Sequence, residues 1–486
     1  MNQQIIYLLP ILIPIFLAIL IKITWEVQQL RYPILLSGPI LALLSVYKIQ
    51  ENSEFFSFSI NIFDIFPNIG ISLGLEPISF VFIIMVNSLW LVATLYSYGY
   101  MRTNNEKRLG NFFSFFAIAI GCANGAALSS NLLTLFIFYE LLTVSTYPLV
   151  THKGDEQSKQ SGRKYLLILL GTSLCFFLPA MGYVYFLSGN LDFVSGGLLT
   201  TTLSGMEVNN IAISILLVLF IFGISKAAVM PFHSWLPAAM VAPTPVSALL
   251  HAVAVVKVGV FSIIKVLVYI FGLDILLGLF TVDLMIYICG FTIITTSVIA
   301  LKQDNLKKLL AYSTISQLSY VIIAILILTP SAIIAASMHL VAHAVSKITL
   351  FFAAGAIYSS TGYTKISEMD GIGKKLKVVS IAFTLGAMSL VGIPLLVGFT
   401  SKWYIVQSSV EVGQWFILLI ITTSTLLNIG YFTPIIYKFF FKNELKEVSF
   451  KTLPRDISLS IIICCALMVI LFLQPNLVME VISYVK

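Results

Sequence analysis

Three side chains that can gain or lose a proton follow one another at steps of four residues in the stretch HLVAHAVSKITLFF: His339, His343 and Lys347. In a helix of about 3.6 residues per turn this spacing places all three on one face, about 6 Å apart along the axis. Imidazole titrates near neutral pH, and a desolvated lysine can lose its proton. A single buried histidine is more often a packed, hydrogen-bonded side chain. Three such groups in line instead predict a path that passes protons through one or two intervening waters.

Few other charged residues lie in the apolar stretches. Glu140 is the one acid placed at the middle of such a stretch, and four more lysines occur there: Lys226, Lys257, Lys265 and Lys402. A charge at the centre of a membrane helix costs about 2.5 to 3.5 kcal/mol, so each of them is a candidate functional residue. We expect Glu140 to pair with Lys226, either as a static ion pair or as a pair that opens during proton movement. Lysine, unlike arginine, can release its proton, which favours titration, and anion binding by the lysines is the competing interpretation.

Two further basic residues flank Lys257. His251 precedes it by six residues, which turns the two side chains about 240° apart on a regular helix, so a local bulge would be needed to join them. Lys265 follows two turns later, toward the outer surface. A structural role, with its amine extended toward that surface, and a functional role are equally open, and Lys265→Ala is expected to change proton movement little. In the order of the spans, the row from Glu140 to Lys402 runs parallel to the membrane. It therefore needs water-filled half-channels to both surfaces.

The composition is that of an all-α polytopic membrane protein. Hydrophobic residues make up 59% of the 486 positions and charged residues 10%, where soluble domains have about a quarter charged. A membrane helix needs about 20 mostly apolar residues. Fourteen segments meet this requirement, near 4–23, 33–49, 78–98, 112–128, 131–151, 164–187, 210–230, 245–271, 280–301, 306–328, 331–358, 379–407, 414–440 and 457–475.

Basic residues are distributed unevenly over the predicted loops. Lys and Arg concentrate in the cytoplasmic loops of membrane proteins. If the first segment starts outside, 21 of the 28 basic residues fall in inner loops, and only Lys48 and Lys486 fall outside. This split predicts a multi-pass protein of the cell inner (cytoplasmic) membrane with both termini on the outer side. The inner charges are spread over six loops, so no nucleic acid partner is expected.

Two of the fourteen segments carry helix-breaking residues. In the seventh, Pro231 and Pro237 are expected to break the helix just after Lys226, and in the twelfth Pro394 and its neighbouring glycines break it before Lys402. Both breaks adjoin a Ser-Lys pair, five spans apart, as in the inverted repeats of transporters. We therefore expect one integral membrane domain over 1–486, with N-terminal helices (1–98), a first five-helix repeat (112–271), a second, inverted repeat (280–440) and a final helix (457–475).

Three stretches carry a resemblance to a known family: SKAAVMPFHSWLPAAMVAPTPVSALLHAVAVVKVGVF, FYELLTVSTYPLV and HAVSKITLFFAAGAIY. They resemble the antiporter-like membrane subunits shared by respiratory complex I, membrane-bound hydrogenases and Mrp-type cation/proton antiporters. The length, the lysine at 402 and the phrase SKITLFF are most similar to the Mrp antiporter D subunit. WLPAAMVAPTPVSALLHA is as similar to complex I and Mrp A subunits.

The resemblance implies a fourteen-helix fold with inverted five-helix repeats and a central relay of lysines. By motif position it makes Glu140 and Lys226 the coupling pair, Lys257 the bridging lysine and Lys402 the terminal proton donor or acceptor. The positions that connect them in the family are matched by His251, His339, His343 and Lys347.

The sequence thus predicts a proton-translocating subunit of a multi-subunit Na⁺ or K⁺/H⁺ antiporter, with other membrane subunits, protons, the cation and the lipid bilayer as partners. The alternative is a proton-pumping membrane-arm subunit of an NADH:quinone oxidoreductase or membrane-bound hydrogenase. A haem protein with histidine ligands and a scaffold with unused charges are weaker interpretations. No cofactor and no metal are expected, because no nucleotide-binding glycine motif and no cysteine set with cluster spacing occurs. Whether the chain counts as an enzyme is left open.

Overall fold

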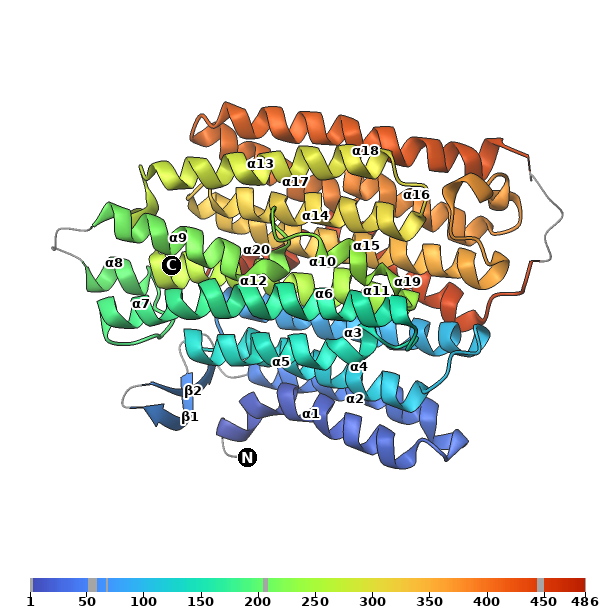
Figure 1. Cartoon of the computed structure of the whole chain (residues 1–486), viewed down its shortest axis with the longest axis horizontal. Helices are drawn as coiled ribbons and strands as arrows, with labels where there is room; N and C mark the ends of the chain where they lie inside the picture. Colours follow the sequence, from blue (N-terminus) through green and yellow to red (C-terminus); the bar gives the residue numbers. More distant parts are fainter. Residues whose placement is uncertain (1–2, 51–58, 67–68, 204–208, 444–449, 486) are drawn as a thin grey trace.

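The computed structural model describes residues 3–50, 59–66, 69–203, 209–443 and 450–485, and nearly all of this chain is helical. Figure 1 shows long helices running side by side, with a small β-hairpin at one end of the bundle. Twelve helices in the described ranges are long and apolar enough to cross a membrane. They coincide with twelve of the fourteen predicted segments, and shorter helices occupy the other two. The prediction of an all-α polytopic membrane protein is confirmed. Lys446 and Lys486, which entered the charge count, lie outside the described residues.

The N-terminal part contains three continuous helices and one hairpin. The helices are α1 (Gln3–Thr24), α2 (Gln28–Gln50) and α3 (Pro77–Thr103). Strands β1 (Ser59–Phe66) and β2 (Ile69–Gly74) pair antiparallel between α2 and α3. The sequence analysis predicted no strand between the second and third spans.

A buried pair of amides joins the first helices of the bundle. The side chains of Asn87 and Asn124 bond to each other in both directions, at 3.0 and 3.1 Å. Asn124 also donates to the main-chain oxygen of Pro10 at 2.8 Å. Pro14, one turn later, has no N–H to give that oxygen, so the asparagine replaces the missing helical bond. The proline thus creates an acceptor that a neighbouring helix uses.

The next part runs from α4 to the first predicted break. It contains α4 (Leu109–Leu128), α5 (Leu132–Val150), α6 (Glu156–Thr172), the π turn η1 (Ser173–Phe177), α7 (Leu178–Ser188), the short α8 (Leu198–Thr202) and α9 (Asn210–Gly223). Helix α9 ends at Gly223, before Lys226 and not after it as predicted. Lys226 lies in a 3-10 turn, η2 (Ser225–Ala227). The break therefore precedes both prolines.

The two prolines shape the chain beyond the break. Pro231 lies in the turns that follow η2, and Pro237 lies inside the short helix α10 (Trp235–Ala238). The break itself coincides with a close approach, since a side chain on Gly223 would meet the backbone of Phe177 in η1. Tight packing against the neighbouring span, and not a missing proline N–H, marks the end of α9. The sequence signal gave the right segment but the wrong residue.

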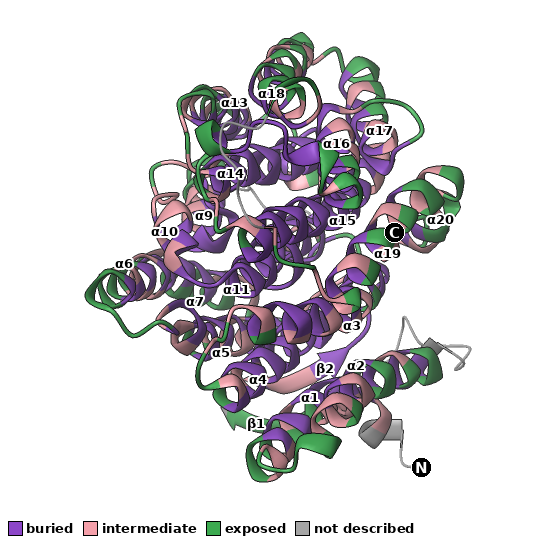
Figure 2. Cartoon of the chain, turned by 90° about the vertical axis from the view of Figure 1, so that its right-hand side faces the viewer, coloured by how far each residue is buried: buried purple, intermediate pink, exposed green. Residues whose placement is uncertain are grey.

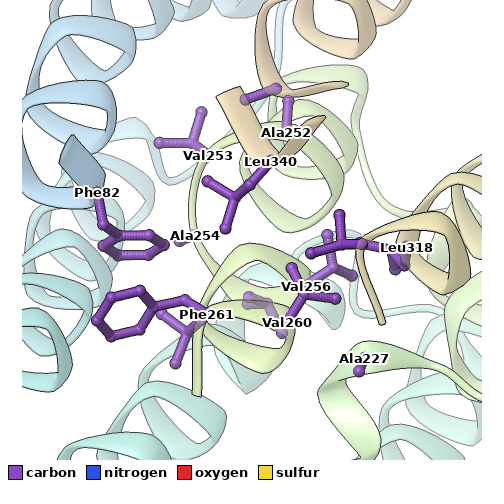
Figure 3. Close-up of a cluster of buried hydrophobic side chains, with 14 of the residues drawn as sticks. Phe82, Ala227, Ala252, Val253, Ala254, Val256, Val260, Phe261, Leu318 and Leu340 are labelled. Carbon is purple, nitrogen blue, oxygen red and sulfur yellow. The ribbon is translucent and has the colours of Figure 1, made fainter. Parts of the chain in front are cut away.

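The eighth span is assembled from several helical pieces. They are η3 (Ala239–Val241), α11 (Thr244–Ala248), the π turn η4 (Leu249–Val253), α12 (Val255–Val266), the π turn η5 (Leu267–Phe271) and η6 (Asp274–Leu276). The chain bends at Ala254, between η4 and α12. Apolar side chains from four other elements surround this bend, including Phe82, Leu318 and Leu340 (Figure 3). The bulge that the sequence left open is thus present.

The second half of the chain contains the remaining spans. They are α13 (Phe280–Leu301), α14 (Leu306–Ile325), α15 (Pro330–Thr361), the turns η7 (Ile366–Glu368) and η8 (Ile372–Lys374), α16 (Lys377–Val391), α17 (Val397–Glu411), α18 (Trp415–Phe441), α19 (Arg455–Leu473) and the short α20 (Asn476–Ile482). The twelfth segment is broken between α16 and α17, as predicted. Gly392 ends α16 with φ +92°, and Pro394 follows in the connection. Lys402 lies in the second turn of α17.

The centre of the bundle is formed by the eighth and eleventh spans. The apolar windows of Thr244–Phe271 and Pro330–Thr361 are buried throughout. Figure 2, which looks along the helices, shows α11, α14 and α15 surrounded by other helices, with exposed residues gathered on the outer elements. Ionisable residues of these two spans are therefore held away from lipid by protein.

Lys265 is part of a buried ion pair, and its amine does not extend to the surface. Its side chain is fully buried, and Nζ lies 2.9 Å from Glu76 Oε2. The amine also donates to the main-chain oxygen of Ser129, and Ser79 donates to the same carboxylate at 2.6 Å. Because Glu76 precedes α3 and Ser129 follows α4, the pair ties α12 to both helices. Glu76 lies shortly after the hairpin, which the sequence did not predict.

We predict that Lys265→Met lowers the free energy of unfolding by about 3 to 5 kcal/mol, since it leaves a largely buried carboxylate without its partner. Adding Glu76→Gln should recover most of this loss. The measurement is a double-mutant cycle on purified protein, with unfolding followed in detergent. A single variant as stable as the wild type would show that the pair does not hold these helices together.

A second polar contact lies in the turn after α5. Nε2 of His152 is 3.9 Å from Glu106 Oε2, and Arg108 donates to the main-chain oxygen of His152. Burial, and then the positive charge of Arg108, lower the pKa of His152 from 6.5 to about 4. The folded protein therefore holds this imidazole neutral at pH values where the unfolded chain protonates it.

This difference predicts a pH dependence of stability. As pH falls from 6.5 to about 4, the unfolded state takes up a proton at His152 and the folded state does not, so folded stability decreases over this window. His152→Gln should remove that part of the decrease and leave stability above the window little changed. Unfolding midpoints across this pH range test it, and parallel curves for variant and wild type would contradict it.

Candidate functional site

The lysines and histidines predicted from the sequence come together in the interior of the bundle. We define the basic row as Lys226, Lys257, His343, His339, Lys347 and Lys402, which lie on η2, α12, α15 and α17 and are all buried. A buried ammonium group is strongly destabilising unless acceptors surround it. The hydrogen bonds of each lysine therefore define the site.

Tyr139 holds Lys226 in three ways. The ammonium nitrogen donates to the main-chain oxygen of Tyr139 at 2.8 Å and lies 3.1 Å from the centre of its ring. The main-chain N–H of Lys226 donates to the Tyr139 hydroxyl at 3.1 Å. Thr143, one helical turn further, accepts a bond from the ammonium at 2.6 Å. Carbonyl, hydroxyl and aromatic face together solvate the cation without a counter-charge.

The predicted ion pair between Glu140 and Lys226 is not formed. Glu140 lies within electrostatic range of the ammonium, but neither of its oxygens has a hydrogen-bond partner in the described part of the chain. Consecutive residues of a helix point about 100° apart. Because Lys226 packs onto Tyr139, the carboxylate of the next residue points along another direction. The sequence could place both charges at one depth but could not give their directions.

Lys257 and His343 form the closest contact of the basic row. Lys257 Nζ lies 2.7 Å from His343 Nδ1 and donates to the main-chain oxygen of Leu340 at 3.1 Å. When Lys257 is protonated it can only donate, so Nδ1 then accepts this bond and the neutral imidazole carries its own proton on Nε2. Nε2 has no partner among the described residues. The pair thus has one proton donor, one acceptor and one open nitrogen.

His251 does not reach Lys257, although the bulge in the eighth span is present. Its ring packs against Phe351, with 4.9 Å between ring centres. The nearest charges acting on it are those of Lys347 and Lys307, and neither ring nitrogen has a partner in the described residues. The π turn therefore directs His251 against Phe351, one turn beyond Lys347 on α15, within electrostatic range of His343 and Lys347. It lies beside the basic row and not within it.

The remaining members connect α15 with α17. The rings of His343 and His339 are 6.4 Å apart and nearly parallel, at 8°, close to the 6 Å step expected from their spacing. His339 Nδ1 lies 3.0 Å from Ser401 Oγ, and its ring stacks on Tyr320 at 5.4 Å. Lys402, next to Ser401 in sequence, lies 5.3 Å from the same tyrosine ring. Tyr320 thus bridges a histidine and a lysine.

The two outer lysines also bond to neutral acceptors. Lys402 donates to the main-chain oxygen of Val391 at 3.0 Å and to Thr425 at 3.1 Å. Val391 ends α16, so the ammonium satisfies a free carbonyl at the negative end of a helix. Lys347 donates to the main-chain oxygen of Leu310 in α14 at 3.0 Å and lies within electrostatic range of His343.

Several residues of the site were not predicted from the sequence. Tyr139, Thr143, Ser401 and Thr425 contact the basic row through short polar side chains or an aromatic face. Such residues are common in membrane helices, so their types alone carry little signal. One usable signal existed for the first two, because Tyr139 and Thr143 stand one turn apart and directly flank the intramembrane acid.

The fold and the site together define a polytopic membrane protein that holds amines and imidazoles in its interior. The family described as NADH:quinone oxidoreductase/Mrp antiporter, transmembrane region, matches residues 129–428. The matched part is more than half of the chain, so the chain belongs to this family, and the predicted resemblance is confirmed.

Two relatives of similar length come from the two kinds of complex that the family description names. The chain is 30% identical to the N subunit of the NADH-quinone oxidoreductase of Desulforudis audaxviator over 77% of this chain and 74% of the relative. It is 28% identical to the D subunit of the Na(+)/H(+) antiporter of Bacillus subtilis over 74% of this chain and 71% of the relative. It is also 29% identical to the A/B subunit of a probable K(+)/H(+) antiporter of Rhizobium meliloti, but spans only 34% of that longer protein.

Two solved structures share the fold. A chain of the Mrp complex from Dietzia sp. DQ12-45-1b matches with a TM-score of 0.86 and 18% identity, over 99% of this chain and 97% of the other. A chain of the membrane-bound sulfane sulfur reductase, an archaeal respiratory membrane complex, matches with a TM-score of 0.84 and 22% identity, over 99% and 96%. These relatives are subunits of multi-subunit membrane complexes, so other membrane subunits are the partners of this class of chain.

The geometry around Lys226 predicts a specific effect of Thr143. Thr143→Val keeps the shape of the side chain but removes the hydroxyl that accepts from the ammonium. A hydrogen bond to a charged group contributes about 1.5 to 3 kcal/mol, so we expect the free energy of unfolding to fall by this amount. Thr143→Ser, which keeps the hydroxyl, is the matched control. Equal stability of the two variants would show that Lys226 does not depend on this bond.

Proposed function

We propose that the chain is the proton-translocating subunit of a multi-subunit antiporter that exchanges Na⁺ or K⁺ for protons, and that the basic row carries the protons. The contact between Lys257 and His343 supports this most strongly, because a 2.7 Å approach lies within the distance for direct proton transfer. The likeness to the D subunit of the Na(+)/H(+) antiporter of Bacillus subtilis favours the antiporter.

In the proposed path, protons move along α15. From Lys257 the proton passes to His343 Nδ1, while His343 Nε2 releases its own proton toward His339. The free nitrogens of His343 and His339 lie in a polar interior, where buried polar groups are normally satisfied by bound water. Ser401 and Tyr320 then link His339 to Lys402. His251 joins the path from its side, through Lys347.

Glu140 and Lys226 are the proposed coupling pair. In the described arrangement Lys226 rests on neutral acceptors, with the unpaired carboxylate in electrostatic range. Movement of the ammonium from Tyr139 and Thr143 to Glu140 would change the charge that the rest of the row experiences. The helix breaks at Ile224 and Gly392 are proposed as the places where water reaches the row from the two membrane surfaces, since irregular backbone within a membrane occurs where it is buried in protein or lines a water-filled cavity.

The repeat organisation and the orientation are part of the proposal. Spans 112–271 and 280–440 are proposed as inverted repeats, supported by the two breaks that each adjoin a Ser-Lys pair, Ser225-Lys226 and Ser401-Lys402. The chain is proposed to lie in the cell inner membrane with both termini outside, supported by the distribution of Lys and Arg.

A proton-pumping subunit of an NADH:quinone oxidoreductase is the second candidate, favoured by the 30% identity to the N subunit of the Desulforudis audaxviator enzyme. It would use the same residues, driven by electron transfer in other subunits. Neighbouring genes for small antiporter subunits would favour the first function, and genes for quinone-binding and iron-sulfur subunits the second.

If Lys257 must release its proton during transport, arginine cannot replace lysine at this position. Lys257→Arg keeps a positive charge but cannot release its proton, so it should lower cation-dependent proton movement by about tenfold or more, as Lys257→Ala does. Lys226→Ala and Lys402→Ala should also abolish it. The assay is quenching of a pH-sensitive dye in inverted membrane vesicles that contain the whole complex.

Lys302→Arg, on an exposed residue outside the basic row, is the matched control, and copurification of partner subunits shows that the complex assembles. Wild-type proton movement in Lys257→Arg would mean that a fixed positive charge suffices, which contradicts the relay.

A further inference from the structure

A second group of lysines surrounds a cavity at the end of the bundle opposite the hairpin. The cavity has a volume of about 630 Å³ and lies between the turn after α5, the start of α6, the segment 234–244 and the start of α14. Four lysines and two acids line it: Lys153, Lys164, Lys307, Lys308, Glu106 and Asp155. It is separate from the basic row, and the function proposed above does not use it.

The two acids of the cavity are already engaged. The carboxylate of Asp155 accepts from the main-chain N–H of Ser158 at 2.7 Å and caps α6. Glu106 faces His152 at 3.9 Å, and burial raises the pKa of its carboxyl group. No ion pair in the described residues joins either acid to a lysine of the cavity, although Glu106 lies within electrostatic range of Lys153 and Lys307, and Asp155 lies within range of Lys153. The four lysines nevertheless outnumber the two acids. The cavity therefore keeps an excess of positive charge.

The lysines are placed unfavourably for a site without a ligand. Lys307 and Lys153 are close enough to repel each other, and Glu106 offsets part of this repulsion at Lys307. The side chains of Lys153, Lys164 and Lys308 are exposed to water. The amine of Lys307 donates to the main-chain oxygen of Ala242, whereas no hydrogen bond or ion pair joins the amines of Lys153, Lys164 and Lys308 to another described residue. Like charges around one cavity raise its energy unless an anion lies between them.

The start of α14 adds to this positive field. Asn305 caps the helix by accepting from the main-chain N–H of Lys308 at 3.1 Å, and both residues line the cavity. The N-terminus of a 20-residue helix carries about half a positive charge and attracts phosphate groups. Hydroxyl groups of Tyr312 and Tyr363 in the wall provide further donors.

We propose that this cavity binds a phosphate group, held by Lys153, Lys164 and Lys308 at the N-terminus of α14. The phosphate can come from the headgroup of an anionic phospholipid or from free phosphate, and the two share the same chemistry. Basic pockets between membrane helices on the side that carries the Lys and Arg loops bind anionic headgroups in this way. Since Lys307 is also one of the charges nearest His251, an anion here would act on the edge of the basic row.

The test measures binding to the full chain in neutral detergent by native mass spectrometry. The probes are phosphatidylglycerol, phosphatidylcholine and inorganic phosphate. The pocket variant is Lys153→Gln with Lys164→Gln and Lys308→Gln. The matched control removes three exposed basic residues near the same end, none of which lines the cavity, by Lys159→Gln, Arg163→Gln and Lys302→Gln.

We expect phosphatidylglycerol to bind the wild type and the control alike, and the pocket variant to bind about tenfold to a hundredfold more weakly. Displacement of the lipid by inorganic phosphate would identify free phosphate as a ligand, and resistance to displacement would identify the headgroup. Equal losses in both variants, or equal binding of phosphatidylcholine throughout, would overturn the proposal. Thermal unfolding checks that each variant is folded. If the triple variant is not folded, Lys153→Gln alone replaces it and is expected to lose less lipid binding. Because the readout is binding, the result is independent of proton transport.

Discussion

The structure depends on how it accommodates positive charge in an apolar interior. Each lysine of the basic row donates to a main-chain carbonyl: Lys226 to Tyr139, Lys257 to Leu340, Lys347 to Leu310 and Lys402 to Val391. A carbonyl oxygen has a second lone pair beyond its helical bond, so it can accept from an amine without unwinding the helix. It carries no net charge, so an amine that loses its proton leaves no unpaired ion behind. Lys265, by contrast, is paired with a carboxylate and would leave one. This difference separates lysines suited to titration from one that holds helices together.

Breaks and bulges in the helices follow from the same constraint. A regular helix fixes the direction of every side chain. The 3-10 turn η2 turns Lys226 toward α5, the π turn η4 turns His251 against Phe351 of α15, and the end of α16 frees the carbonyl that Lys402 uses. α15, by contrast, is a continuous helix. Its regular four-residue spacing keeps His339 and His343 parallel and one step apart.

The sequence predicted those features that depend on local pattern. Hydrophobic length located the spans, glycine and proline located the twelfth-span break, and the spacing of His339 and His343 gave their common face. Features that depend on direction between elements were predicted less well. A direct contact between Glu140 and Lys226 is absent because neighbouring residues diverge around a helix. The partner of Lys265 was not predicted because Glu76 follows an unrecognised hairpin. The end of α9 was wrong by a few residues, since a backbone contact with Phe177 sets it. Neutral acceptors such as Thr143 were not predicted, because an uncharged polar residue does not stand out in an apolar segment.

The central claim is that Lys257 and His343 share protons as one unit. Nitrogen NMR on the full chain in lipid, labelled at lysine and histidine and assigned with Lys257→Met and His343→Gln, observes both groups directly. Strongly interacting groups titrate in steps that belong to the pair. The account predicts that the signals of the amine and the imidazole move together as pH changes between about 5 and 9, and that removing either group alters the titration of the other. Signals that stay fixed over this range, or that move independently, would contradict it.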